Sequence, residues 1–161
     1  MSCLGVHFAI PSGTGGALWD GDDAARAFVE RLEAAWDTDH LQETDKAWDP
    51  IHRCLTDGTV GWCPEAWPLN GAILGDDPLY KGDDYIVQHL FANEVVEVAD
   101  GLDRVTQEWF RERFLALAEH GYDGAVDEAA FDYVWYWFER LRAFFRRSAD
   151  EGRETVFTAD Q

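Results

Sequence analysis

Positive charge is what this sequence has least of. Its 161 residues include 13 lysines and arginines, of which only Lys46 and Lys81 are lysines, against 32 aspartates and glutamates, so the net charge is −19. Nucleic acids and anionic lipid surfaces are bound largely through lysine and arginine. We therefore expect neither as a partner. A surface this acidic either keeps the protein soluble or attracts a basic protein and speeds their encounter.

Long apolar runs and paired cysteines are also missing. No apolar stretch approaches the roughly 18 residues of a membrane-spanning helix, and the first five residues do not resemble a signal peptide, so we expect a cytoplasmic protein. Cys3, Cys54 and Cys63 form no Cys-x-x-Cys pair, which indicates reduced thiols. His52, Cys54 and Cys63 could be drawn as three zinc ligands. Their spacing matches no zinc finger and no fourth ligand follows, so we predict no metal site.

The signatures of common enzyme classes are absent as well. The loop 12–16 is rich in glycine but lacks the Lys-Ser/Thr ending of a phosphate loop, and the acids at 20, 22 and 23 would repel a phosphate. No Gly-x-Ser-x-Gly nucleophile motif occurs. His7 and His89 fall within predicted strands, where we expect structural roles. We predict no cofactor.

What the sequence has in abundance is apolar residues, at 47%, which indicates a folded domain rather than disorder. We treat residues 1–161 as one domain. Alternating apolar residues predict strands at 4–10 and 85–91, and a closing strand at 155–157. Helical spacing predicts helices over about 20–36, 93–103, 106–117 and 127–151. A short helix is predicted from a Thr44 cap to about Leu55, bent or broken at Pro50, and residues 56–83 are predicted to be mostly loop, pinned by Trp62 and other apolar side chains.

These elements predict an α+β fold: a small sheet of about four strands covered by helices on one or both faces, the second case giving three layers. The long aromatic C-terminal helix would be the main cover. One of its stripes is Phe131, Val134, Trp135, Phe138, Leu141 and Phe145, and a second is Tyr133, Trp137 and Phe144. A helix that is apolar on two sides is either enclosed between layers or exposes an aromatic patch, and we expect it to be enclosed.

The middle of the chain holds the candidate site. Its residues are Asp45, Lys46, Trp48, His52, Trp67 and Asn70. If the first segment is helical, Asp45, Trp48 and His52 share one face, and a carboxylate beside an imidazole is the minimum for acid–base chemistry. The alternative is a polar network that only holds the loop in place. We predict that the Trp48–His52 turn and the Trp67–Asn70 corner meet and form the walls of one recess.

At these segments the chain resembles the YfbM-like family, a group of uncharacterised bacterial proteins. The resemblance is carried by residues 1–10, by Asp45-Lys46-Ala47-Trp48-Asp49 with His52, by 67–75 and by 93–99, all in the same order. It implies a compact domain that mixes helices with a small sheet, and it implies no activity, cofactor or catalytic residue. Pro50 and the loop 12–16 depart from the pattern, so we expect a distorted short helix.

Two functions remain open from the sequence. The first is a non-enzymatic binding protein that neutralises a basic protein partner, supported by the charge and by the lack of a nucleophile or metal motif. The second is a small hydrolase or transferase that uses Asp45 and His52, with Asn70, in a tryptophan-lined pocket. A third possibility is a fold that only oligomerises through its long helix. The sequence does not give the oligomeric state.

Overall fold

The structure, a computed structural model, describes residues 3–160. Within that range it contains five α-helices and four β-strands. The strands are β1 (Gly5–Ile10), β2 (Leu41–Asp45), β3 (Tyr85–Leu90) and β4 (Glu154–Asp160). The helices are α1 (Asp22–Ala35), α2 (Trp48–Leu55), α3 (Ala92–Asp103), α4 (Gln107–Leu115) and α5 (Glu128–Asp150). Short 3-10 turns join them, among them η1 (Gly15–Trp19), η3 (Pro64–Ala66) and η4 (Leu69–Ala72). The predicted α+β class is confirmed.

The strands form one antiparallel sheet in the order β2-β1-β4-β3. The last strand of the chain is therefore central, with β1 on one side and β3 on the other. Phe8 lies opposite Val156 and His7 lies opposite Phe157, so the two residues of each pair send their side chains to the same face, and the two pairs point to opposite faces. The outer strands are β2 and β3.

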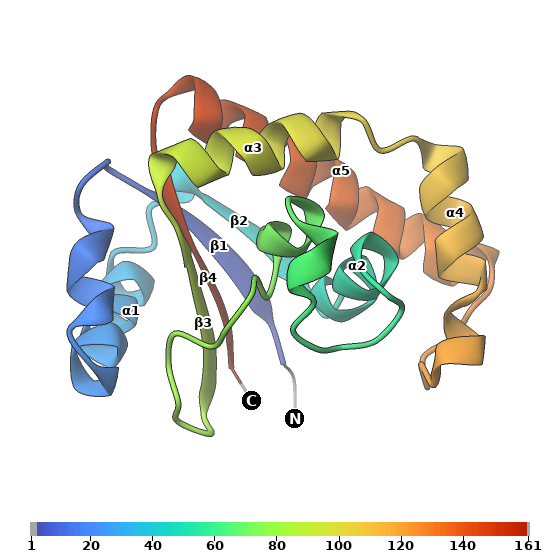
Figure 1. Cartoon of the computed structure of the whole chain (residues 1–161), viewed down its shortest axis with the longest axis horizontal. Helices are drawn as coiled ribbons and strands as arrows, with labels where there is room; N and C mark the ends of the chain where they lie inside the picture. The colour runs from blue at the N-terminus through green and yellow to red at the C-terminus, as the bar shows by residue number, and fades with distance from the viewer. Residues whose placement is uncertain (1–2, 161) are drawn as a thin grey trace.

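Both faces of the sheet are covered by helices, which gives three layers (Figure 1). Phe8, Ile10 and Val156 point to one face and pack with Leu18 and with Phe28 of α1. The opposite face carries the larger core, and α2, α3, α4 and α5 contribute to it. The sheet has the predicted four strands, and helices cover both of its faces, which is the three-layer case of the prediction.

One strand was missed. Residues 41–45 form β2, so Thr44 does not cap a helix; it is fully buried and its hydroxyl donates to the Gly5 carbonyl at 3.2 Å. The helix begins later, at Trp48, and runs unbroken through Pro50 to Leu55. Pro50 does not bend it because it lies in the first turn, where backbone N–H groups have no partner within the helix.

The long helix α5 is enclosed only in part. Asp127 caps it by accepting from the Ala130 N–H at 2.8 Å. The first predicted stripe is buried apart from the half-buried Trp135, and Phe144 of the second stripe is buried too. Tyr133 of the second stripe is 39% exposed, and the nearby Tyr136 is 46% exposed. The prediction of a fully enclosed helix is therefore wrong at its N-terminal half. No helix in the described range is long and apolar enough to cross a membrane.

The segment between α2 and β3 contains no α-helix or strand among its described residues, as predicted, but it is well packed. Ile73 and Leu74 are buried, and η4 packs against both α2 and α3. Trp62 was expected to pin the segment, but it is 41% exposed. Trp67, at the end of η3, donates its indole N–H to Glu97 of α3, and that placement shapes the site described next.

Candidate functional site

The structure separates Asp45 from the two residues predicted to share its helix face. Asp45 is the last residue of β2, with φ of 49°, whereas Trp48 and His52 lie in α2. The Asp45 carboxylate accepts a hydrogen bond from the Tyr133 hydroxyl at 2.7 Å, which ties β2 to α5. The prediction of one helical face is wrong because the strand extends to Asp45. Lys46, the next residue, is exposed.

His52 and Trp48 have buried partners of their own. The His52 ring is fully buried and its Nε2–H donates to the Gly61 carbonyl at 2.7 Å. Burial lowers the pKa of His52, which therefore stays neutral at pH 7. The Trp48 indole N–H donates to the Cys3 carbonyl at 3.0 Å. Both side chains hold α2 against neighbouring segments.

Trp67 ends η3 and Asn70 belongs to η4, and they do not face Trp48 across an opening. Asn70 is fully buried and its amide donates to Asp76 at 2.7 Å. Trp67 lines a recess beside β3, while Trp48 lines a different one of about 550 Å³ with Cys3 and Trp62. Between them α2 and η4 pack directly, through buried Ile51, Ala72 and Ile73 among others. The predicted single recess is not formed, and the functional roles of these residues stay predictions.

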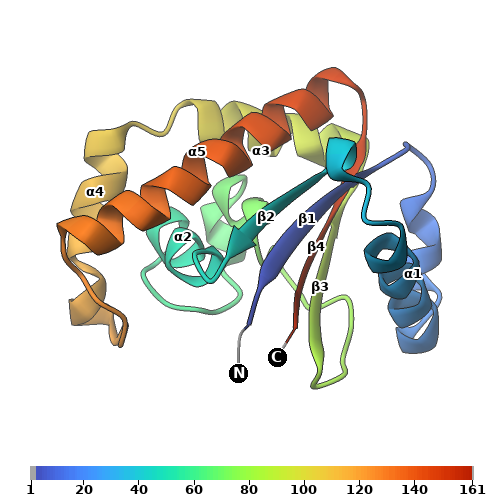
Figure 2. The ribbon, with the colours of Figure 1, turned by 180° about the vertical axis from the view of Figure 1, so that it is seen from behind.

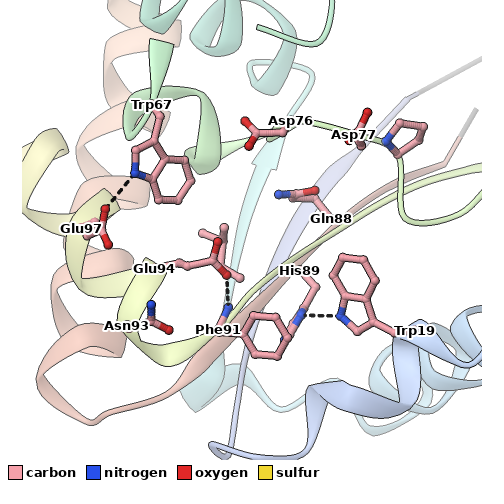
Figure 3. Close-up of a pocket in the computed structure, with 12 residues that line it drawn as sticks. Trp19, Trp67, Asp76, Asp77, Gln88, His89, Phe91, Asn93, Glu94 and Glu97 are labelled. Atoms are coloured by element: carbon pink, nitrogen blue, oxygen red, sulfur yellow. Dashed lines mark hydrogen bonds between the residues drawn. The ribbon is translucent and has the colours of Figure 1, made fainter. Parts of the chain in front are cut away.

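The recess that contains Trp67 has a volume of about 590 Å³ and lies at the edge of the sheet, against the end of β3 (Figure 3). We call it the β3 recess. Its lining is Trp19, Trp67, Asp76, Asp77, Pro78, Gln88, His89, Leu90, Phe91, Asn93, Glu94 and Glu97. Of the predicted site residues only Trp67 is among them, although Asn70 bonds to Asp76.

One part of the β3 recess is aromatic. Trp19 and Phe91 are nearly parallel, with ring centroids 6.3 Å apart and an angle of 8° between planes. His89 stands roughly perpendicular to both, at 6.2 Å from Trp19 and 4.6 Å from Phe91. Trp19 is 58% exposed and Phe91 44%. Two large apolar rings thus remain open to solvent at the recess, available to a ligand.

The rest of the lining is acidic. Glu97 accepts from the Trp67 indole N–H at 2.8 Å, and Glu94 accepts from the Phe91 N–H at 2.9 Å at the start of α3. These bonds fix two carboxylates, and Asp76 and Asp77 add two more (Figure 3). No lysine or arginine is among the lining residues of the described range. The recess therefore carries uncompensated negative charge.

A buried carboxylate–imidazole pair lies under the aromatic part. The Nε2 of His89 is 2.7 Å from Glu154, and both side chains are almost fully buried. The Trp19 indole N–H donates to His89 Nδ1 at 3.1 Å. Because an indole N–H can only donate, Nδ1 is the acceptor, and the proton of the neutral ring lies on Nε2 and points to Glu154. His89 thus has the structural role that was predicted, through its bonds to Glu154 and Trp19, and it also lines the β3 recess.

The glycine-rich loop serves this pair. The N–H groups of Gly13 and Gly15 both donate to the Glu154 carboxylate. A Cβ atom on Gly15 would overlap the His89 ring and the Glu154 carboxylate, so this position needs glycine. Clustered backbone N–H groups make an anion site, and here the anion is a carboxylate of the chain itself. That is why the loop resembles a phosphate loop without its lysine.

These contacts decide which chemistry the recess can support. Both nitrogens of His89 are engaged, so the imidazole presents no free lone pair for proton transfer. Within residues 3–160 no group of three or more histidine, cysteine, aspartate or glutamate side chains is placed to hold a metal ion. What remains is aromatic faces beside carboxylates, an arrangement that attracts organic cations through cation–π contacts and ion pairing.

Comparisons with known proteins agree with the resemblance inferred from the sequence. The profile of a family described as "Domain of unknown function (DUF1877)" matches residues 1–158. A crystal structure of YfbM from Escherichia coli, described as a protein of unknown function, superposes with a TM-score of 0.66. The two share 20% identity over 97% of this chain and 99% of the other, a level that supports the fold alone. No curated protein matches the chain.

Proposed function

We propose, from the premise that this chain belongs to the DUF1877 family, that it is a cytoplasmic binding protein whose β3 recess receives cationic side chains of a basic protein partner. The family description assigns no activity, so the proposal rests on the recess itself. The observation that carries it is the lining: four carboxylates and three large aromatic rings, with no lysine or arginine among the lining residues in the described range.

Charge makes the first contribution to such binding. The net charge of −19 attracts a basic protein from a distance and raises the association rate, an effect that salt weakens. The acids of the recess then add local contacts. An ion pair between exposed groups contributes about 0.2–1 kcal/mol, so several pairs in one place are needed for useful affinity.

The aromatic rings supply the second contribution. A lysine or arginine over the face of a tryptophan contributes about 0.5–1 kcal/mol at an exposed site and more when water is excluded. Trp19 and Phe91 offer exposed rings beside the carboxylates. This combination favours a cationic side chain over an inorganic cation, because the stem of the side chain also covers apolar surface.

The alternative of a hydrolase or transferase gains no support from the geometry. Asp45 bonds to Tyr133 and His52 bonds to Gly61, so the two do not form an acid–base pair. In the buried pair of Glu154 with His89, of which His89 lines the recess, the imidazole has no free nitrogen. A binding protein is therefore the function we favour.

A labelled short peptide that alternates arginine with threonine is the probe for this proposal, measured by fluorescence anisotropy at low ionic strength. Replacing Asp77→Asn and Glu97→Gln together removes two charges from the recess and retains the oxygen that accepts from Trp67. The matched control is Asp132→Asn with Glu139→Gln, two exposed acids of α5 outside the recess lining. We expect about tenfold weaker binding for the recess variant, which corresponds to about 1.4 kcal/mol.

The control should bind within about twofold of the unaltered protein, because distant exposed charges act only through the screened field of the whole molecule. Equal weakening in both variants would mean that bulk charge, and not the recess, attracts the peptide. A peptide that does not bind even at low ionic strength would refute the proposal.

A further inference from the structure

The two exposed rings of the β3 recess come from different layers of the fold. Trp19 ends η1, which lies with α1 on one side of the sheet, and Leu18 of η1 packs in the core on that side (Figure 2). Phe91 is the N-cap of α3, and α3 belongs to the core on the other side. No single element therefore fixes the angle between the two rings. The indole of Trp19 has one N–H, and its hydrogen bond to Nδ1 of His89 at 3.1 Å ties this ring to the recess (Figure 3).

His89 is held so that its acceptor nitrogen faces Trp19. Its side chain is fully buried, and its Nε2 lies 2.7 Å from an oxygen of Glu154. The same carboxylate accepts from the N–H groups of Gly13 and Gly15, so it is surrounded by donors. An acceptor at this place keeps the imidazole proton on Nε2 and leaves the lone pair of Nδ1 for Trp19. The ring has no room to move, because even a Cβ atom on Gly15 would overlap it.

This arrangement sets the plane of the Trp19 ring before any ligand arrives. Trp19 and Phe91 are parallel to within 8°, although 58% of Trp19 is exposed. Glu94 lies beside them, because one of its oxygens accepts from the Phe91 N–H, and its second oxygen makes no hydrogen bond within residues 3–160. A side chain that is already held in its bound orientation loses less freedom when a ligand binds.

We propose that His89 is a positioning residue through which the β3 recess selects arginine over lysine. His89 offers no nitrogen to the ligand, but it holds the Trp19 ring on which a guanidinium stacks. A guanidinium is planar, stacks on aromatic faces and carries several N–H donors, so it can lie on Trp19 and still reach Glu94. An ammonium is a compact point charge and gains little from a fixed ring plane. This inference rests on the proposed function and specifies which basic side chain is received.

Two substitutions at His89 separate its two hydrogen bonds. His89→Asn keeps an oxygen at the place of Nδ1, where it can accept from Trp19, and loses the contact with Glu154. His89→Gln keeps an amide N–H at the place of Nε2, where it can donate to Glu154, and loses the acceptor for Trp19. Neither substitution changes the charge of a neutral histidine. Thermal unfolding shows whether each variant is folded at the temperature of the binding measurement.

The measurement is the ratio of two affinities, for the arginine–threonine peptide and for its lysine–threonine counterpart, by fluorescence anisotropy at the same ionic strength. We expect the unaltered protein to prefer the arginine peptide about fivefold, as one additional cation–π contact would give. The preference should persist in His89→Asn and fall below about twofold in His89→Gln. A purely structural role for His89 predicts the reverse order, since the asparagine variant is the one that leaves Glu154 without its partner.

Trp19→Phe provides a second test that does not disturb the buried pair. Trp19 is largely exposed, so the variant should fold, and it retains a ring but has no N–H to donate to His89. We expect its preference for the arginine peptide to fall to about twofold or less. A full preference in Trp19→Phe would refute the inference, even if neither His89 variant folds.

The remaining outcomes separate this inference from the function on which it rests. If the unaltered protein binds the arginine and lysine peptides equally well, the recess receives cations without selecting arginine, and the inference fails alone. If both His89 variants keep the preference, or both lose it, His89 does not act through Trp19 and the inference is refuted. If neither peptide binds, the proposed function fails, and the inference fails with it.

Discussion

At the scale of single residues, His7 is the clearest example of a polar group enclosed by the core. Its ring lies 5.9, 5.8 and 4.7 Å from the rings of Phe144, Phe145 and Phe157. Nε2 donates to the Ala72 carbonyl at 2.7 Å, while Nδ1 has no hydrogen-bond partner among the described residues. Burial lowers the pKa of His7 to about 4. The folded protein therefore holds this ring neutral at pH 7.

Stability should fall as the pH drops from about 6.5 to about 4. In that range the unfolded chain protonates His7, whose ordinary pKa is about 6.5, and the folded chain does not. The gap corresponds to a loss of about 3 kcal/mol below the folded pKa. Urea unfolding at a series of pH values should show a flatter dependence for His7→Gln than for the unaltered protein. His120→Gln, at an exposed position, should leave the dependence unchanged, and equal slopes for all three proteins would contradict the prediction.

Individual site residues were predictable only in part from the sequence. Trp67 was identified and does line the β3 recess. His89 was expected to be structural, and Glu154 was not noticed, because the two are separated by 65 residues and nothing local marks them as partners. A sequence shows the spacing of residues within one element well, but it does not show which elements lie side by side. The predicted Asp45–His52 pair failed for a similar reason, since a strand ended where a helix was expected.

At the scale of elements, the glycine-rich segment 12–16 allows two neighbouring glycines, Gly15 and Gly16, to be compared. A Cβ on Gly15 would overlap His89 and Glu154, whereas a Cβ on the adjacent Gly16 meets nothing within 4 Å. Gly15→Ala should destabilise the protein by about 1–3 kcal/mol or more, as overpacking does. Gly16→Ala should be close to neutral. Thermal unfolding of the two variants measures the difference, and comparable melting temperatures would show that Glu154 and His89 move away at little cost.

Most elements could be predicted because each has its own local signal. Alternation identified β1 and β3, and the acidic start, apolar stripe and final glycine identified α5. β2 could not be found, since Leu-Gln-Glu-Thr-Asp has little apolar alternation and its pairing is supplied by β1. A strand at the edge of a sheet is defined by its neighbour more than by its own composition.

At the scale of the whole molecule, net charge should set how stability responds to salt. Ion pairs such as Arg146 with Asp100 and Asp103 are weakened by salt, but 32 acids against 13 bases leave repulsion as the larger effect. Raising the ionic strength from about 0.01 to 0.15 M shortens the Debye length from about 30 to 8 Å. The melting temperature should rise by a few degrees, about 2–4 °C for each kcal/mol of relieved repulsion.

The same α5 control variant, Asp132→Asn with Glu139→Gln, should show a smaller rise with salt because two of the repelling charges are gone. Scanning calorimetry at both ionic strengths measures the effect. A melting temperature that falls on adding sodium chloride would mean that the ion pairs outweigh the repulsion, and the surface would then have to be described as a paired network.

The central position of β4 has a consequence for how this protein is made. A ribosome delivers β1, β2 and β3 well before residues 154–160, so the two strands that flank β4 in the finished sheet must wait for it. During that interval β1 lacks one of its two neighbours and β3 lacks β4, the strand with which it pairs, while the apolar side chains of both strands are already present. The sheet is therefore completed when β4 inserts between β1 and β3. Before that step the partly synthesised chain exposes apolar surface, and this is the stage at which a chaperone would be most needed.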